Sequence, residues 1–324
     1  MTDVTEDRKE HVMRDTILAG LANYIDSGSI VAGAAALALW KEAYNISDTM
    51  LGVIGAFSAN AISAGIGALI GGVLCDKFGR KKIYQYDMLF YAFGMLWLTF
   101  ASSTWMIIVG MVLVGLAVGA DIPASWSLIA ELAPKRQRAK FSGIAQILWA
   151  MGPVVVVTLS LILQPLGILG AQLIFAHLLV VALVLMLLRS KMHESLYWQE
   201  AQASAGAAEK ADWRQLLKPP YLKSILFLVG IYGFWNLWAG TNGFFLPYIL
   251  HTVGGQTQAA SVAFQGYNFL IGIASIFFIF MKFSDRFNQR TLFMTSALLQ
   301  VAGMAMLAVL PLTGTVAFIH ITIM

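Results

Sequence analysis

Charged residues are scarce in this sequence. Asp, Glu, Lys and Arg make up 12% of its 324 residues, whereas hydrophobic residues make up 59%. Soluble domains carry about 25% charged residues, so the composition excludes an ordinary soluble domain and indicates that a lipid bilayer surrounds much of the chain. The formal charge of +4 does not indicate nucleic-acid binding, because the placement of the basic residues accounts for it.

Cysteine is also nearly absent. Cys75 is the only one, which excludes a disulfide within the chain. The sequence lacks a nucleophile and base at a catalytic spacing, a cluster of metal-ligating residues and a P-loop. We therefore expect no enzyme activity, no metal, no cofactor and no ATP-driven transport within this chain.

Apolar runs of about 20 residues, the length that crosses a bilayer, recur along the chain. They predict an all-α integral membrane protein with nine complete spans and the start of a tenth, which runs from Thr315 to Met324. The nine lie at 16–40, 50–75, 83–102, 104–130, 141–163, 168–188, 224–250, 259–281 and 292–311. The first run is full length, so we expect no cleaved signal peptide.

The basic residues alternate from one loop to the next. All of them except Lys41 fall in the N-terminal tail or in the loops after the even-numbered spans. By the positive-inside rule, the N-terminus and these loops are predicted to be cytoplasmic. We expect a multi-pass protein of a bacterial inner (plasma) membrane.

A charged stretch between the second and third spans interrupts this apolar sequence. It runs from Gly72 to Lys82 and contains Asp76, Gly79, Arg80 and Lys81, with a glycine that permits a tight turn. The pattern G-x-L-x-D-K-x-G-R-K resembles the signature loop of major facilitator superfamily (MFS) transporters. A second copy follows span eight, where Asp285 and Arg286 begin a similar run.

The MFS resemblance implies two six-helix bundles related by an axis along the membrane normal. It divides the chain into a tail (1–15), an N-terminal bundle (16–188), a cytoplasmic linker (189–223) and a partial C-terminal bundle (224–324). On this interpretation the chain lacks most of helix ten and all of helices eleven and twelve, and we expect a monomer. Small residues spaced three or four apart in span two predict a closely packed neighbour, which the resemblance identifies as the absent helix eleven.

Two further loops are similar to those of the sugar-porter branch. Glu131 and Arg138 lie in a run like A-E-x-x-P-x-x-x-R, and Glu194 lies in a run like P-E-S-x-R-W. The resemblance implies that they join Asp76 and Arg80 in a cytoplasmic charge network that latches the outward-open state.

Ionisable groups inside a span are functional candidates, because each is costly to place there. Asp26 lies in span one and Asp121 in span four, and no Lys or Arg is expected deep in any span. Carboxyl groups in that setting can bind and release a proton. The two segments are similar to those of metabolite:proton symporters, although Met111 stands where an arginine is usual. A purely structural role for either residue stays open.

Amide and aromatic side chains within the spans are candidates for contacting a small-molecule substrate. Amides hydrogen-bond hydroxyls and aromatics stack on sugar rings, although both also pack between helices. The candidates are Gln146, Trp149, Asn236, Trp238, Asn242, Gln265 and Asn268.

The function that the resemblance implies is secondary active transport of a sugar, polyol or organic acid, with proton symport by alternating access. Two alternatives stay open. One is a proton-coupled efflux antiporter for drugs or metabolites, and the other is a non-transporting membrane receptor or inactive fragment.

Overall fold

The computed structural model describes residues 2–58, 61–133, 138–190, 194, 198–200, 203, 217–283 and 287–323. Within these residues the chain is helical and contains no strand. The helices are α1 (Thr2–Ala43), α2 (Asp48–Ala56), α3 (Ile62–Phe78), α4 (Arg80–Thr99), α5 (Thr104–Leu132), α6 (Arg138–Leu163), α7 (Ile168–Arg189), α9 (Tyr221–Thr252), α10 (Gln258–Ser275), α11 (Met281–Phe283), α12 (Gln289–Val309) and α13 (Gly314–Ile323). A 3₁₀ turn (Gln164–Leu166) precedes α7, and a π-helical turn (Ile276–Phe280) follows α10.

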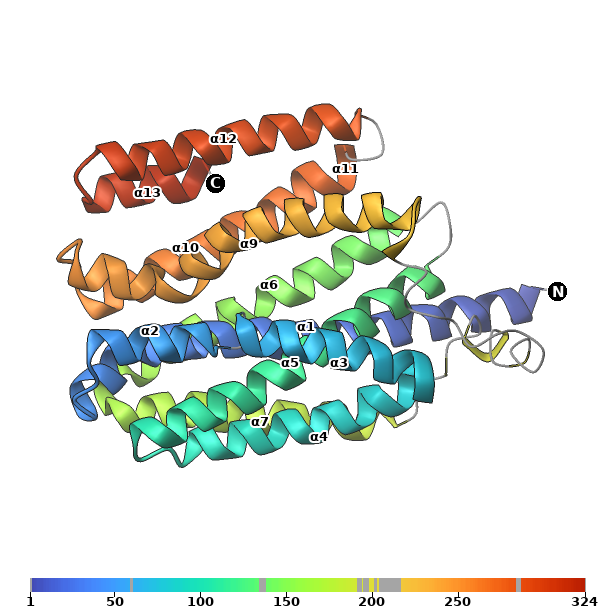
Figure 1. Cartoon of the computed structure of the whole chain (residues 1–324), viewed down its shortest axis with the longest axis horizontal. Coiled ribbons are helices and arrows are strands. Elements are labelled where there is room, and N and C mark those ends of the chain that lie inside the picture. The colour runs from blue at the N-terminus through green and yellow to red at the C-terminus, as the bar shows by residue number, and fades with distance from the viewer. Residues whose placement is uncertain are drawn as a thin grey trace.

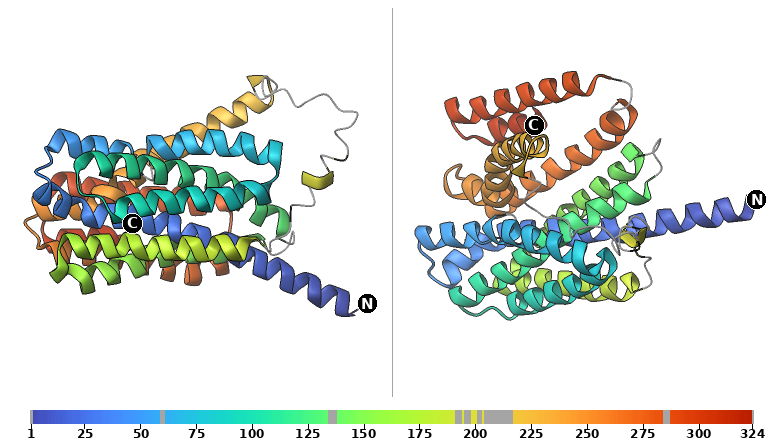
Figure 2. Two further views of the ribbon diagram at one scale, coloured as in Figure 1. Left: turned by 90° about the horizontal axis from the view of Figure 1, so that it is seen from below. Right: turned by 45° about the vertical axis from the view of Figure 1, so that its right-hand side comes forward.

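The helices lie roughly side by side in two groups (Figure 1). In the first group α1 packs on α6 and α7, α5 packs on α3 and α4, and α4 packs on α7. In the second group α9 contacts α10, and α12 contacts α13. The groups meet where α6 packs on α10 and α1 packs on α9. Figure 2 shows α12 and α13 on the outer side of the second group.

Two ends of the bundle are distinguished below. The tail side holds the start of α4 and the ends of α5 and α7, near the projecting N-terminal part of α1, and the far side holds the ends of α1 and α9 (Figures 1 and 2).

Polar residues cap several helices on the far side. The side chains of Ser47 and Ser103 accept hydrogen bonds from the first-turn amides of α2 and α5, and Thr257 does the same for α10. Such caps satisfy amides that have no partner within the helix. The helix starts are therefore encoded locally.

The second apolar run forms two helices, α2 and α3, with a break between Ala56 and Ile62. Each is shorter than a full span. The prediction of a single helix over this run is therefore wrong. Gly79 alone joins α3 to α4, with φ 96°, a conformation that disfavours a residue with a Cβ. The predicted tight turn at Gly79 is confirmed.

The small residues of α3 pack against α5. A Cβ at Gly67 or Gly71 would meet the backbone of α5, and a Cβ at Gly119 of α5 would meet the backbone of α3. The prediction of close packing is confirmed, but the partner is α5. The prediction that these small residues pack on an eleventh helix is therefore wrong for α3, the second half of the apolar run.

Six of the described helices are long and apolar enough to cross a membrane: Thr104–Leu132, Lys140–Leu166, Ile168–Arg189, Tyr221–Thr252, Gln258–Phe283 and Arg290–Val309. Of these, Thr104–Leu132 is the most buried and Tyr221–Thr252 the least. The fold is thus a helical membrane protein with its densest packing in the first group.

Candidate functional site

Buried carboxyl groups gather inside the first group of helices. Asp26 of α1 is 3% exposed, Asp121 of α5 is 1% exposed and Asp87 of α4 is 7% exposed. Neither carboxyl oxygen of Asp26 has a hydrogen-bond partner among the described residues. A proton on one carboxyl would allow Asp26 and Asp121 to hydrogen-bond to each other. The two predicted residues are therefore neighbours, and Asp87 is an additional member that the sequence analysis did not select.

Arg189, the last residue of α7, also lies in this cluster. Its Nη1 is 3.1 Å from Oδ1 of Asp121, and both side chains are buried. The expectation that no Lys or Arg lies deep in a span is wrong, because Arg189 folds back into the bundle instead of joining the following loop. A buried guanidinium beside a buried carboxylate balances a charge that would otherwise be costly.

Tyr84 of α4 holds the guanidinium from a second side. The centre of the guanidinium lies 3.9 Å from the centroid of the Tyr84 ring, and Nη1 also donates to the Tyr84 carbonyl at 3.4 Å. Arginine is suited to such stacking because its charge is delocalised and weakly hydrated. Arg189 thereby ties α7 to both α4 and α5.

The charges of this cluster do not balance when every group is ionised. Asp26, Asp87 and Asp121 would contribute three negative charges against one positive charge from Arg189, and all four side chains are buried. Uncompensated buried charge is strongly unfavourable. Protons on two of the three carboxyls would remove the imbalance, and this gives the cluster a chemical reason to bind and release protons.

Polar groups of α1 surround the cluster. The Tyr91 hydroxyl donates to the carbonyl of Ile25 at 2.8 Å, and the Ser125 hydroxyl donates to the Asn23 amide oxygen at 3.4 Å. The hydroxyl of Ser27 donates to the carbonyl of Trp149 on α6. These bonds fix the middle of α1 against α4, α5 and α6, so Asp26 lies on a well-supported helix.

A second charged group lies at the tail side, around the turn at Gly79. Arg80 is 3.5 Å from the carboxylate of Asp76 and 3.5 Å from that of Glu131. The sequence predicted that these three residues lie together, and the structure brings them together. Gly72 is less constrained, because a Cβ there would meet open space.

Glu194 binds the start of α4. One of its carboxylate oxygens accepts from the backbone amide of Arg80 at 3.0 Å, and the other accepts from that of Lys81 at 3.2 Å. The indole of Trp198 donates to the carbonyl of Asp76. A carboxylate is favoured at a helix N-terminus, so Glu194 joins the network through the α4 backbone. Two predicted members, Asp285 and Arg286, and the side chain of a third, Arg138, lie outside the described residues.

The predicted substrate residues are distributed over both groups of helices. Trp149 of α6 packs against Phe269 of α10 with ring centroids 5.8 Å apart, and buried Gln265 donates to the carbonyl of Gly243 at 2.6 Å. Asn236 and Asn268 are half-buried, while Gln146 is exposed. Trp149 lies where the two groups meet, Gln265 bonds within the second group, and Gln146 does not take part in either contact.

Trp238 and Asn242 line a cavity of about 390 Å³ within the second group. His320 of α13 also lines it, and its Nδ1 bonds to the Gly303 carbonyl at 2.9 Å. The Nε1 of Trp238 and the Nε2 of His320 are buried without a hydrogen-bond partner in the described part of the chain.

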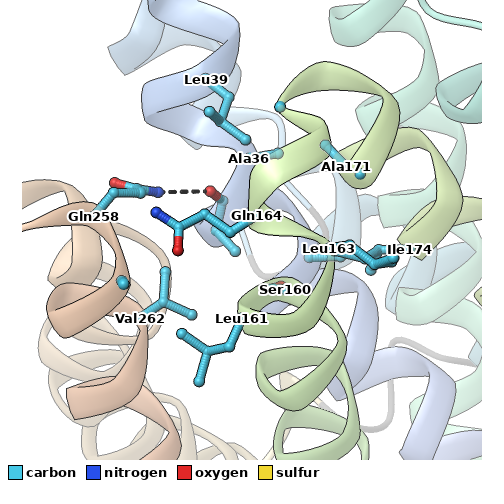
Figure 3. Close-up of a pocket in the computed structure, with 15 residues that line it drawn as sticks. Ala36, Leu39, Ser160, Leu161, Leu163, Gln164, Ala171, Ile174, Gln258 and Val262 are labelled. Carbon is cyan, nitrogen blue, oxygen red and sulfur yellow. Dashed lines mark hydrogen bonds between the residues drawn. The ribbon is translucent and has the colours of Figure 1, made fainter.

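A smaller cavity lies where α1, α6 and α7 face α10 (Figure 3). Gln258 points across it and donates to the Ala35 carbonyl at 3.0 Å, with Gln164 nearby. Its volume of about 30 Å³ suits a water molecule, since one needs about 10–15 Å³ of such space. This cavity is too small for a sugar or polyol.

A polar contact joins the two groups at the far side. The Lys41 ammonium donates to Asp48 and, at 3.0 Å, to the Tyr248 hydroxyl, which itself donates to Asp48 at 3.0 Å. The bonds from Lys41 and then Tyr248 hold the pKa of Asp48 below its ordinary value. The bonds to Asp48 and then Tyr248 hold the pKa of Lys41 above its ordinary value. We call Lys41, Asp48 and Tyr248 the far-side contact.

Three comparisons with known proteins bear on this arrangement. The family profile described as Major Facilitator Superfamily matches residues 16–324. The minor myo-inositol transporter IolF of Bacillus subtilis (strain 168) is 49% identical over 306 residues, which are 92% of this chain and 69% of that protein. The glucose transporter GlcP of Staphylococcus epidermidis is 22% identical over 322 residues, covering 90% of this chain and 70% of that one.

A solved structure shares the arrangement of helices. It is the proton:xylose symporter XylE bound to 6-bromo-6-deoxy-D-glucose, with a TM-score of 0.78 and 18% sequence identity over 98% of this chain and 78% of that one. At this identity the likeness concerns the fold.

Proposed function

This chain belongs to the Major Facilitator Superfamily, and from that premise we propose that it carries a small polyol or sugar across the membrane together with protons. The observation that carries the proposal is the 49% identity to a minor myo-inositol transporter over 92% of this chain. We take a cyclic polyol such as myo-inositol as the first substrate to test, and an aldose sugar as the second.

We place nine complete spans and the start of a tenth in the membrane, in two bundles at 16–188 and 224–324 joined by a linker at 189–223. The alternation of basic residues supports a cytoplasmic N-terminus in a bacterial plasma membrane. The tail side is then cytoplasmic and the far side extracellular. We expect the carrier to act as a monomer, with no nucleic-acid partner.

In this proposal Asp26 and Asp121 exchange the coupled protons. Their burial, their closeness and the charge imbalance around Arg189 support that role. A proton bound from one side neutralises a carboxyl that cannot be left charged and unpaired inside the protein. Release to the other side then requires that the cluster become accessible there, which is the step that alternating access supplies.

Polyol recognition is assigned to side chains of both bundles. Trp149 lies where the bundles meet, Gln265 bonds to α9 within the second bundle, and Trp238 and Asn242 line the larger cavity there. An amide can donate to and accept from neighbouring hydroxyl groups, and an aromatic ring can cover the apolar face of a sugar ring. Asn236 and Asn268 are secondary candidates, and Gln146 is the weakest because it is exposed.

Alternating access is proposed to occur by rocking of one bundle against the other, with polar contacts at both ends of the protein breaking and re-forming. The far-side contact joins the two groups at the end that we assign as extracellular, while the network of Asp76, Arg80, Glu131 and Glu194 joins helices of the first group at the end that we assign as cytoplasmic. Each surface ion pair contributes about 0–1 kcal/mol. Such contacts are weak enough to break and re-form during a transport cycle.

The experiment is uptake of labelled myo-inositol into proteoliposomes that contain the protein, in competition with unlabelled sugars, polyols and organic acids. We expect saturable exchange of myo-inositol, competition by polyols or sugars, and accumulation when the outside is made acidic. Protein-free liposomes are the control. Absence of exchange with every compound would contradict the proposal, and competition by organic acids alone would overturn the substrate class.

A further inference from the structure

The guanidinium of Arg189 has donors that the observed pairing leaves unused. Its Nη1 serves both Asp121 and the Tyr84 carbonyl, while Nε and Nη2 are buried without a partner among the described residues. Oδ2 of Asp121 and Oδ2 of Asp87 are equally unpaired. Buried polar atoms are normally satisfied, so this cluster contains more donors and acceptors than its present arrangement connects.

The stacking of Arg189 on Tyr84 permits the guanidinium to change its carboxylate partner. Its guanidinium lies over the Tyr84 ring, and such a stacked contact tolerates movement within the plane of the ring. Asp87 is three residues after Tyr84 on α4, and residues three apart share one face of a helix. A movement of the guanidinium along α4 would bring its unused donors toward Asp87.

We propose, resting on the proposed function, that Arg189 is a positioning residue for proton coupling that alternates between Asp121 and Asp87. In the first arrangement Arg189 pairs with Asp121, as the structure shows, and we assign the negative charge to Asp121 and the two protons to Asp26 and Asp87. In the second arrangement the O–H bond of Asp87 has broken, an O–H bond has formed on Asp121, and the guanidinium has followed the charge to Asp87. Both arrangements contain two protons and no net charge.

The alternation explains how protons can move through a closed cluster. In the described part of the chain, the titratable groups that interact electrostatically with Arg189 include Asp121 on α5, Tyr84 and Asp87 on α4, and Asp26 on α1. Without a mobile cation, transfer of a proton from one carboxyl to another would leave the new carboxylate unpaired. Because Arg189 moves with the charge, each carboxyl is compensated in turn, and Asp87 becomes a required acceptor.

The test uses Asp87→Asn, which leaves the observed Arg189–Asp121 pair intact. Labelled myo-inositol is followed in proteoliposomes in two ways: exchange at equal pH on both sides, and accumulation driven by an acidic exterior over a series of external pH values. Asp87→Glu is the conservative rescue. Arg189→Lys keeps the charge but lacks the planar fork of donors, and Arg290→Met, at an exposed site on α12, is the control.

We expect Asp87→Asn to retain measurable exchange of myo-inositol and to lose accumulation. Asp87→Glu should recover accumulation, and Arg189→Lys should shift the pH at which accumulation is half maximal. If Asp87→Asn and Arg189→Lys both accumulate myo-inositol with the wild-type pH profile, Arg189 has one fixed partner and the inference is overturned. That result requires a working wild type, whereas failure of the wild type to exchange any polyol refutes the proposed function instead.

Discussion

Two charged groups connect the end of α7 and the residues after it to α4, and they differ mainly in their exposure to water. Arg189 contacts Tyr84 and forms an ion pair with Asp121. The side chain of Arg189 is 1% exposed and that of Asp121 is 0% exposed. On the tail side, Glu194 binds the α4 amides next to an Arg80–Asp76 pair whose carboxylate is 79% exposed.

The comparison shows how one protein assigns different tasks to charge. A buried charge must be compensated at every moment, because its desolvation is costly. The number of protons that the buried cluster binds is therefore tightly constrained, which suits it to proton coupling. An exposed pair is weak and screened by salt, so the tail-side network is suited to a contact that forms in one conformation and breaks in another.

The largest expected effect comes from breaking the buried pair. Arg189→Met leaves Asp121 without its cation, and removal of one partner of a buried pair costs about 3–5 kcal/mol. We expect a large fall in the thermal unfolding temperature in detergent. The double variant Arg189→Met/Asp121→Asn removes both charges and should recover most of the loss. Equal destabilisation in the single and double variants would show that the pair is not the cause.

Gly79→Ala should have the next largest effect. Gly79 has φ 96° and ψ 152°, and a Cβ there would collide with the Glu194 carboxylate, so strain of about 1–3 kcal/mol adds to loss of the tail-side contact. Cys75 is buried at the end of α3 and can report opening through its alkylation rate. We expect faster alkylation in Gly79→Ala and no change in Gly72→Ala, where a Cβ has open space. Equal rates in both would contradict this explanation.

Glu194→Gln should have a smaller effect on the same reporter. It removes the negative charge from the start of α4, and such a charge is typically worth about 0.3–1 kcal/mol. We expect a modest increase in Cys75 alkylation that shrinks as salt is added. Glu42→Gln, at the exposed end of α1, is the matched control. A difference between Glu194→Gln and wild type that persists at high salt would argue against an electrostatic origin.

The smallest effect is expected from the far-side contact. Asp48 has a lowered pKa, so its contribution is present above the ordinary pKa of an aspartate and is lost as pH falls through the lowered value. Lys41 has a raised pKa, so its contribution is present below the ordinary lysine value and is lost as pH rises through the raised value. The contact should be complete at neutral pH and weaken at either extreme.

Spin labels can measure this effect. Labels at positions 42 and 253, both exposed, would be attached after Cys75 is replaced by serine. We expect longer distances to become populated in acid, and Asp48→Asn should show them already at neutral pH. If the labelled protein gives the same distance distribution with Asp48→Asn as with Asp48, the far-side contact does not hold the two groups of helices together.

Much of this arrangement was accessible from the sequence. The apolar runs predicted the helices, and the glycine between Phe78 and Arg80 predicted the turn that the structure contains. Asp76 and Arg80 belong to one dense loop pattern, and the grouping of Glu131 with them was implied by the resemblance to the MFS family. Asp26 and Asp121 were recognisable because a carboxyl inside an apolar run is unusual.

The sequence did not reveal which residues compensate those carboxyls. Arg189 ends an apolar run and precedes Ser190 and Lys191, so its pattern is that of a loop residue, and only the packing of α7 on α4 turns it inward. Asp87 lies just beyond the basic residues that open α4, where charge is expected at a membrane surface. Similarly, the spacing of small residues in α3 predicted close packing, but the identity of α5 as the partner depends on the three-dimensional path of the chain.

The most direct measurement of the central claim is internal pH in proteoliposomes when myo-inositol is added outside. Wild type should acidify the interior as the polyol enters, and Asp26→Asn should exchange labelled myo-inositol without moving the internal pH. That pair of results would identify Asp26 as a carrier of the coupled proton. Entry of myo-inositol with no pH change in wild type, or unchanged acidification in Asp26→Asn, would contradict the account.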